Sequence, residues 1–456
     1  MLVPFLVVLG VFFTIISGFV QFKYFIRMFR VLSSSNQSGD PNTITAREAL
    51  LLSVGGGVGG GNIAGVAVAI TLGGPGAVFW MWAIAIVGMT TSLIECSLAQ
   101  LFKEREADGS FRGGPARTII HGLGADYKWL AILCAICLIA ALGRGFPAFQ
   151  GNTVAGAAQD SKGIDRLIIA IVLAAGTAII VYGGIHRIAK TADVVVPIMA
   201  IDYIGLALIF IVMNIGEIPG VIYTLVANAI GIEGAVSGGM SAVIAQDLRR
   251  GLFSNEAGLG SAPNVAATAD VRHPVSQGIT QSFSVFIDTT IICSCTAFVI
   301  LLGDIYVPGA EGIDGVALTQ QSLVSLLGAS FLTASILLVA FSSVIYNYYL
   351  GENAMTVMTR NPLSIHALRI GITAIVFLGA VVPEATSVFF FSDTIMGVLA
   401  VVNLLALTML FPIAKRLLND FRGQLKAGVV RPAFDPDKFP DLNIDRTAWI
   451  VKETEK

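Results

Sequence analysis

Long apolar runs, one after another along almost the whole chain, constrain this sequence more than any other feature. A helix needs about 20 apolar residues to cross the roughly 30 Å hydrocarbon core of a bilayer. About eleven runs approach or exceed that length, and only 13% of the 456 residues are charged. We therefore expect an all-α integral membrane protein. The predicted spans are residues 2–24, 46–72, 76–101, 129–154, 167–182, 194–213, 234–269, 277–302, 332–350, 365–382 and 388–411.

Lysine and arginine concentrate on alternate connections and near the C-terminus. Since cytoplasmic loops carry the excess of basic residues, we expect a multi-pass protein of the plasma (inner) membrane with the N-terminus outside and the C-terminus in the cytoplasm. Residues 415–456 are predicted to be a solvated cytoplasmic tail. The shorter apolar stretch within residues 217–233 is predicted to be an external interfacial helix, and that at 316–327 is interpreted as interfacial or re-entrant. A net charge of −2 gives no reason to expect a nucleic-acid partner.

Two of the predicted spans contain residues that disfavour a continuous helix. Residues 55–61 are glycine at every position except Val58, and each glycine costs about 1 kcal/mol relative to alanine in a helix. Residues 251–263 contain three glycines and a proline beside charged side chains. The two spans lie five helices apart and cross in opposite directions under the predicted orientation. This layout is typical of an inverted repeat whose first helices unwind near the midplane to bind substrate and ion.

Unwound backbone in a membrane needs partners for its N–H and C=O groups, and a substrate and a cation can supply them. Asn62 is predicted to cap the second half-helix, whose positive end suits a carboxylate. Carbonyls near Gly57 and Val58 suit a cation. In the second broken span Ser254 and Asn255 are predicted to act as caps, with Glu256 in the first helical turn. Close helix packing explains one glycine run equally well, but two runs at corresponding positions favour a binding site.

At these residues the sequence resembles the alanine or glycine:cation (sodium) symporter family. The resemblance rests on VGGGNIAGVA at residues 58–67, GGPGAVFWMW at 73–82 and GLFSNEAGLGSAP at 251–263. It implies a LeuT-type fold of about eleven helices. An extra helix within residues 1–30 would precede five-helix repeats at 44–213 and 234–414. It also implies sodium-driven uptake of a small neutral amino acid, with alanine and glycine as first candidates.

The resemblance also implies roles for single residues. Asn62, Gln150 and Phe253 match positions that contact the substrate's amine, carboxylate and side chain respectively. Sodium would lie between broken-helix carbonyls and two serines, although serines in membrane helices commonly bond to their own preceding turn. The expected substrate-binding residues are Gly60, Gly61, Asn62, Gln150, Phe253, Ser254 and Asn255, and the expected Na+ ligands are Gly57, Val58, Gly61, Ser342 and Ser343.

The chain departs from the family pattern at two places. Gly60 stands where the family usually has threonine, which removes a hydroxyl and affects the pocket or an ion ligand. Residues 113–117 read GGPAR where the family has GGPMYY, so the chain departs from the pattern at Ala116 and Arg117. We connect this loop with gating.

Ionisable side chains inside the spans are functional candidates, because burying them costs roughly 2.5–3.5 kcal/mol on insertion scales. We interpret Glu95 and Asp202 as carboxylates that hydrogen-bond unwound backbone. Asp288 is left open between that role and a cation or proton site.

Three further charged residues are candidates for an extracellular gate. Arg249 and Arg250 precede the second break, and Asp393 is their candidate partner. Snorkelling of both arginines to the interface is equally compatible with the sequence.

These features predict a sodium-coupled symporter of small neutral amino acids that works by alternating access. Its partners are an amino-acid substrate and the lipid bilayer, and no obligatory protein partner is implied. A proton-coupled symporter with Asp288 or Glu256 as the carrier is the nearest alternative, and a channel is the alternative from another class. An enzyme is not expected, because the sequence contains no nucleophile–base or metal-ligand pattern.

Overall fold

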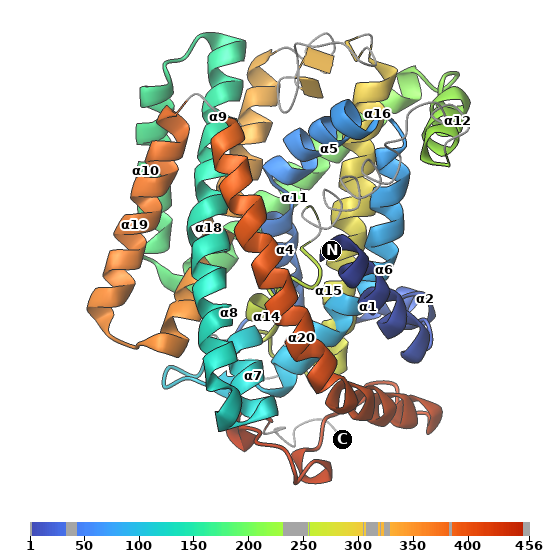
Figure 1. Cartoon of the computed structure of the whole chain (residues 1–456), viewed down its shortest axis with the longest axis vertical. Coiled ribbons are helices and arrows are strands. Elements are labelled where there is room, and N and C mark those ends of the chain that lie inside the picture. The colour runs from blue at the N-terminus through green and yellow to red at the C-terminus, as the bar shows by residue number, and fades with distance from the viewer. Residues whose placement is uncertain are drawn as a thin grey trace.

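The computed structural model describes residues 2–32, 43–230, 254, 256–303, 305–306, 318–319, 321–322, 329–382 and 385–449, and this part of the chain is almost entirely helical (Figure 1). The first half contains α1 Leu2–Ile16, α2 Val20–Lys23, α3 Phe25–Leu32, α4 Ala46–Gly57, α5 Gly60–Gly73, α6 Ala77–Leu101, α7 Pro115–Leu123, α8 Lys128–Ala140, α9 Phe146–Lys162, α10 Arg166–Val181, α11 Gly184–Met213 and α12 Ile218–Ala229. The second half contains α14 Ala262–Ala266, α15 Pro274–Val285, α16 Cys293–Leu302, α18 Ala329–Met358, α19 Pro362–Val381 and α20 Ala385–Lys426. A short antiparallel hairpin, β1 Glu104–Arg105 and β2 Phe111–Arg112, connects α6 to α7.

Helices that are long and apolar enough to cross a bilayer dominate the described residues. Six meet this test singly, and the pair Ala46–Gly57 and Gly61–Gly73 meets it together with a bend of 63° between them. The prediction of an all-α membrane protein is therefore confirmed, whereas the count of eleven spans stays a prediction. The six single spans are Ala77–Leu101, Ala125–Gln159, Arg187–Met213, Pro274–Leu302, Pro362–Val381 and Thr394–Lys426.

The N-terminal region differs from the single helix predicted within residues 1–30. It forms three helices: Gly18 and Phe19 adopt left-handed backbone angles, with φ of 70° and 55°, and separate α1 from α2, and Tyr24 separates α2 from α3. Helix α1 packs against α6 and α20, and α3 packs against α15. The 15 residues of α1 span about 22 Å at 1.5 Å per residue, which is less than the hydrocarbon core.

The helices around α4 position the site. Helix α4 packs against α11, α18 and α15, while α9 packs against α18 and α19, and α10 joins α19 at one edge of the molecule (Figure 1). Two spans contain π-helical turns, Ala141–Gly145 between α8 and α9 and η3, Phe286–Ile292, between α15 and α16. Such turns occur frequently at functional sites, and Asp288 lies in η3.

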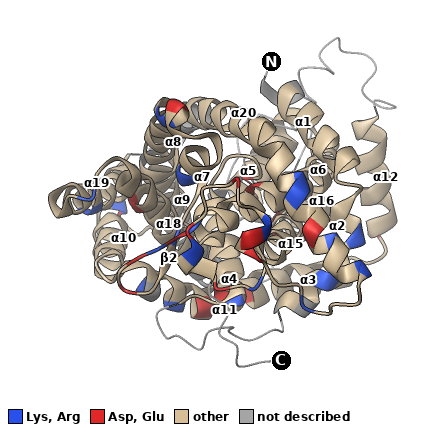
Figure 2. Ribbon diagram, turned by 90° about the horizontal axis from the view of Figure 1, so that it is seen from below, with Lys and Arg blue, Asp and Glu red and all other residues tan. Residues whose placement is uncertain are grey.

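The C-terminal segment packs on the helix ends at its aromatic residues, while most of residues 427–449 are exposed or half-buried. The prediction of a solvated cytoplasmic tail stays a prediction. The N–H of Phe434 donates to the carbonyl of Arg272 at 2.8 Å, and the Trp449 ring stacks edge-on against Phe434. Lys103 Nζ lies 4.3 Å from the Trp449 ring centroid. These aromatic side chains attach the tail to the helix ends, since their large apolar area is stabilised by burial. Seen from this end, charged residues lie mainly on helix ends and connections (Figure 2).

Candidate substrate and ion site

The first break interrupts the helical run at Val58 and Gly59. Helix α4 ends at Gly57, Val58 donates its N–H to Val54 O at 2.8 Å, and Gly59 is the N-cap of α5 without a side-chain cap. The expected capping role of Asn62 is therefore wrong. The helix restarts at Gly60, so Asn62 already lies in the first turn, with its N–H bonded to Gly59 O at 3.1 Å.

One side of this break faces two serine hydroxyls on α18. Ser342 Oγ donates to Gly55 O at 2.8 Å, and Ser343 Oγ donates to Gly56 O at 3.0 Å. The structure thus brings the predicted serines to broken-helix carbonyls, although these carbonyls precede the expected pair, Gly57 and Val58. Ser342 also lies 2.8 Å from the carbonyl of Val339 in its own helix, so the commoner back-bonding accompanies the contact between helices.

Gln150 of α9 and a buried asparagine of α18 extend the same cluster. Gln150 Nε2 donates to Ser343 Oγ at 3.0 Å, and Asn347 Nδ2 lies 3.2 Å from the same oxygen. Both amides are wholly buried. Side chains of two helices therefore direct neutral oxygen and nitrogen atoms at the carbonyl end of α4, where the negative end of the helix dipole favours a cation.

The other side of the first break faces a carboxylate. Asn62 Nδ2 donates to Asp288 Oδ1 at 2.6 Å and lies 3.2 Å from Asp288 O. Ser254 Oγ and Thr289 Oγ1 lie 3.4 and 3.2 Å from Asp288 Oδ2. A Cβ added to Gly57 would lie 3.4 Å from Asp288 Oδ1. Asp288 therefore contacts residues of both broken spans, a junction that the sequence did not reveal.

A second buried carboxylate, that of Glu95, bonds to the backbone of the second break. Glu95 Oε1 accepts the N–H of Gly258 at 3.1 Å, and Asn403 Nδ2 donates to Glu95 Oε2 and to Gly258 O, each at 2.9 Å. The prediction that Glu95 bonds unwound backbone is confirmed. For Asp202 the described bond comes instead from the side chain of Ser335 on α18, and its bonding to unwound backbone stays a prediction.

Glu256 differs from its expected place in a first helical turn. Its φ is 52°, in the left-handed region, and the next helix, α14, begins only at Ala262. Gly258 and Gly260, both with positive φ, interrupt the helical backbone here, as the sequence pattern indicated for this span, whereas Pro263 lies in the first turn of α14, where proline is tolerated.

Several predicted site residues lie outside the part of the chain that the structure describes. These are Phe253, Asn255, Arg249 and Arg250, while Asp393 belongs to α20 without a described side chain. Their proposed roles stay predictions. Of the remaining set, Gly61 lies close to the second broken span, because a Cβ added to this glycine would lie 3.9 Å from Ser254 Cα.

Arg117, one of the departures from the family pattern, lies at the cytoplasm-directed helix ends of the predicted topology. Arg117 Nη1 donates to Asn353 Oδ1 at 2.9 Å, and Nε pairs with Glu104 at 3.1 Å. Asn353 Nδ2 in turn donates to Asn264 Oδ1 at 2.6 Å. Arg117 thus connects α7 to α18 directly and to α14 through Asn353, and its relation to gating stays a prediction.

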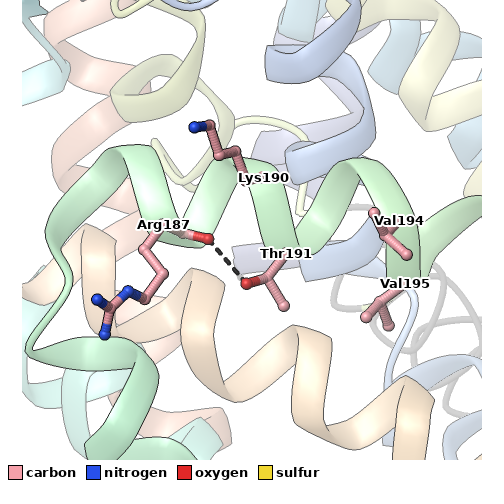
Figure 3. Close-up of a pocket in the computed structure, with 5 residues that line it drawn as sticks. All are labelled: Arg187, Lys190, Thr191, Val194 and Val195. Atoms are coloured by element: carbon pink, nitrogen blue, oxygen red, sulfur yellow. Dashed lines mark hydrogen bonds between the residues drawn. The ribbon is translucent and has the colours of Figure 1, made fainter.

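A hollow of about 430 Å³ beside α11 is distinct from these clusters (Figure 3). All five lining residues come from that one helix, and Thr191 Oγ1 donates to the carbonyl of Arg187 at 2.8 Å. No predicted site residue lines it. The breaks therefore remain the candidate site.

The sequence analysis did not identify two residues that contact the breaks, Asn347 in α18 and Asn403 in α20. The sequence signal for each was a polar residue inside an apolar run.

Solved structures of low sequence identity share this fold. A structure of MhsT in complex with L-phenylalanine matches with a TM-score of 0.55 and 13% identity, over 84% of this chain and 99% of that one. A manganese transporter of Eremococcus coleocola matches with a TM-score of 0.51 over 84% of this chain and 83% of that one, at 12% identity. The expected LeuT-type architecture is confirmed.

Protein sequences give a more specific relationship. The amino-acid carrier protein AlsT of Bacillus subtilis is 43% identical over 99% of this chain and 95% of its own length. The probable sodium/glutamine symporter GlnT of the same organism is 40% identical over 100% and 94%, and the sodium/alanine symporter AgcS of Methanococcus maripaludis is 34% identical over 89% and 92%. Residues 1–436 match the sodium:alanine symporter family. The chain is therefore a multi-pass membrane transporter, not an enzyme, and belongs to the sodium:alanine symporter family, whose coupling ion is sodium.

Proposed function

We propose that this protein carries alanine, glycine or a similar small neutral amino acid into the cell together with sodium, by alternating access. The observation that carries the proposal is the pair of serine hydroxyls on the carbonyls of Gly55 and Gly56, in the last turn of α4. Hydroxyl and carbonyl oxygens are the ligands that a hard monovalent cation prefers, and unwound helices supply them in this architecture. Family membership and the sodium/alanine symporter among its relatives support the same assignment.

In the proposed mechanism, Ser342 and Ser343 rotate their hydroxyl hydrogens away when sodium arrives, so that their oxygens face the ion. Gly55 and Gly56 contribute the carbonyls that these hydroxyls now occupy. Sodium would order the end of α4 and neutralise its negative dipole end. Each bound species then raises the affinity for the other, because both need the same unwound backbone in one arrangement.

The substrate carboxylate would bind the N–H groups at the start of α5, where Gly60 and Gly61 carry no side chain. Gln150 lies close enough to Ser343 to connect substrate and ion. Phe253 and Asn255 belong to the proposed pocket, and Arg249, Arg250 and Asp393 to the proposed extracellular gate. The orientation with the N-terminus outside and the C-terminus inside belongs to this proposal too, on the distribution of basic residues.

Uptake into proteoliposomes tests the proposal. We expect radiolabelled alanine and glycine to accumulate only with an inward sodium gradient. Ser343→Ala should raise the sodium concentration for half-maximal uptake about tenfold, which corresponds to about 1.4 kcal/mol. Thr408→Val is the matched control, since among the described residues its hydroxyl bonds to Leu404 O in its own helix, and it should transport like the unaltered protein.

Other outcomes separate the alternatives. Glutamine should be included, because a relative is named a probable sodium/glutamine symporter and Gly60 leaves more room than threonine. Sodium-dependent uptake of glutamine alone would change the substrate but keep the coupling. Uptake that follows the pH gradient and ignores sodium would instead support the proton-coupled alternative, and non-saturable flux would support a channel.

A further inference from the structure

The short helices that follow α1 expose an apolar face. The left-handed backbone at Gly18 and Phe19 separates them from α1. The N–H of Tyr24 donates to Val20 O and that of Met28 donates to Tyr24 O, so the helical repeat continues from α2 into α3. Apolar residues spaced three, four and three positions apart lie on one face of such a helix. The four residues with this spacing are Phe19, Phe22, Ile26 and Phe29, whose exposed fractions are 52, 60, 74 and 51%.

Basic residues accompany this apolar face, and acidic residues do not. Lys23 and Arg27 each come directly after an exposed apolar residue of the face, and Arg30 continues the spacing in the sequence. Residues 1–39 contain no aspartate or glutamate, although the whole chain has a net charge of −2. Figure 2 shows lysine and arginine on both α2 and α3. An exposed apolar face beside basic residues is typical of helices that lie in a membrane interface.

The end of α20 brings a second segment of the same character to this place. The last part of α20 turns sideways below α2 (Figure 1). The guanidinium of Arg27 donates to the carbonyl of Val430, just beyond the end of α20, and the Val430 side chain is 73% exposed. Lys426 and Arg431 beside it are exposed as well. Residues 421–434 again contain no acidic residue, so basic and apolar side chains of both segments gather on one surface.

We propose that this surface binds the headgroup of an acidic phospholipid, such as phosphatidylglycerol, from the surrounding bilayer. The inference goes beyond the proposed function and does not depend on it. The basic groups would face the lipid phosphate, and the apolar side chains would enter the boundary between headgroups and acyl chains. A soluble anion or a nucleic acid would pair with the charges but leave the apolar side chains in water. Both segments also continue from membrane helices, α1 and α20. The surface consists of Phe22, Lys23, Ile26, Arg27, Lys426 and Arg431.

Helix α3 connects this lipid surface to the candidate site. The rings of Phe25 and Phe286 lie edge to face with centroids 5.1 Å apart, and those of Phe29 and Phe283 lie 4.8 Å apart. Phe286 is the first residue of η3, the π-helical turn that also contains Asp288. A lipid that holds α3 in place would therefore also hold the helix that lines the breaks.

Lipid binding to the purified full-length protein tests the inference without relying on transport. The protein, freed of lipid in a neutral detergent, would be titrated with phosphatidylglycerol or with phosphatidylcholine, and native mass spectrometry would count the bound lipids. We expect phosphatidylglycerol to bind about tenfold more tightly. Lys23→Gln and Lys426→Gln should each weaken its binding about fivefold, or ~1 kcal/mol, and leave phosphatidylcholine binding unchanged. Lys190→Gln is the matched control, since it removes an exposed lysine of α11, and both lipids should bind to it as before.

The apolar half of the surface is tested separately. Ile26→Ser should weaken both lipids alike, by about tenfold, because it removes apolar area and no charge. Glycerol phosphate, the soluble part of the headgroup, should not displace phosphatidylglycerol at equal concentration, because it cannot contact the apolar side chains.

Several results would overturn the inference. Equal affinity of the unaltered protein for both lipids would do so, as would a preference for phosphatidylglycerol that survives in the double variant Lys23→Gln and Lys426→Gln. An equal loss in Lys190→Gln would mean that net charge alone attracts the lipid. Displacement by glycerol phosphate would show a site for a soluble anion. A lipid-free dimer that Ile26→Ser converts to a monomer would instead make this face a contact between two copies of the chain.

Discussion

Glu95 and Asp288 are both buried carboxylates inside membrane spans, and each contacts a broken helix, but their neighbours differ. Glu95 accepts a backbone N–H and the amide of Asn403, whose single NH₂ group also bonds Gly258 O. Asp288 accepts bonds from three side chains, Asn62, Ser254 and Thr289, each of which can turn. The first carboxylate has fixed donors on both oxygens, whereas the second has donors that can become ligands.

Burial alone therefore does not make a carboxylate an ion site. A backbone N–H cannot reverse its polarity, so Glu95 has a permanent partner and acts as a brace for the second break. Hydroxyls and amides offer both a donor and an acceptor. A cation at Asp288 would therefore find oxygens on the three described side chains that bond to its carboxylate once these turn, without movement of the backbone.

The largest expected effect is on stability, when Glu95 and Asp288 are each replaced by the isosteric amide. In Glu95→Gln the new NH₂ group faces the NH₂ group of Asn403, and two donors cannot bond to each other. If the Asn403 amide turned, its oxygen would accept from the glutamine but would then lie against Gly258 O, which is also an acceptor. One buried group stays unpaired, which costs about 1–3 kcal/mol of unfolding free energy. In Asp288→Asn the hydroxyls of Ser254 and Thr289 rotate to accept the new donor, so the loss should be smaller.

Thermal unfolding of both variants in sodium-free detergent solution measures this difference. The unaltered protein and Asp202→Asn serve as references. A larger loss of stability in Asp288→Asn than in Glu95→Gln would contradict the assignment of a structural role to Glu95 and a ligand role to Asp288.

A second prediction concerns the glycine beside each carboxylate. Gly258 has a φ of 84°, a left-handed conformation in which any residue with a Cβ pays about 1–2 kcal/mol. Gly258→Ala should therefore lower the unfolding midpoint. Gly57→Ala should not, because Gly57 is helical and its added Cβ would meet Asp288 Oδ1 only at 3.4 Å.

The same unfolding measurement compares the two alanine variants, and sodium binding adds a second readout. Gly57→Ala should weaken sodium binding, since its methyl group covers part of Asp288. If Gly258→Ala were as stable as the unaltered protein, the second break would not need its left-handed turn. The hydrogen bond from Gly258 to Glu95 would then not be required to hold that turn.

Much of the fold and part of the site followed from sequence patterns. Apolar run length predicted the membrane helices, and the glycines of residues 55–61 predicted the first break, because both are local properties. The glycines did not show where the helix resumes, so Asn62, expected as a cap, lies in the first helical turn. They also did not show that the carbonyls facing the serines are those of Gly55 and Gly56. Contacts such as Glu95 with Asn403 join residues 308 positions apart, and no local pattern encodes such a pair.

The smallest expected effect comes from Thr289→Val, which removes one hydroxyl 3.2 Å from Asp288 Oδ2 and keeps the side chain's shape. Without sodium, the variant should lose about 0.5–1.5 kcal/mol, the usual net value of one hydrogen bond. With saturating sodium the loss should shrink, because the ion then satisfies the carboxylate in place of the hydroxyl. Unfolding midpoints in sodium and in choline measure the two values. An equal loss in both salts would mean that sodium does not reach Asp288, and its carboxylate would then be a second structural brace like that of Glu95.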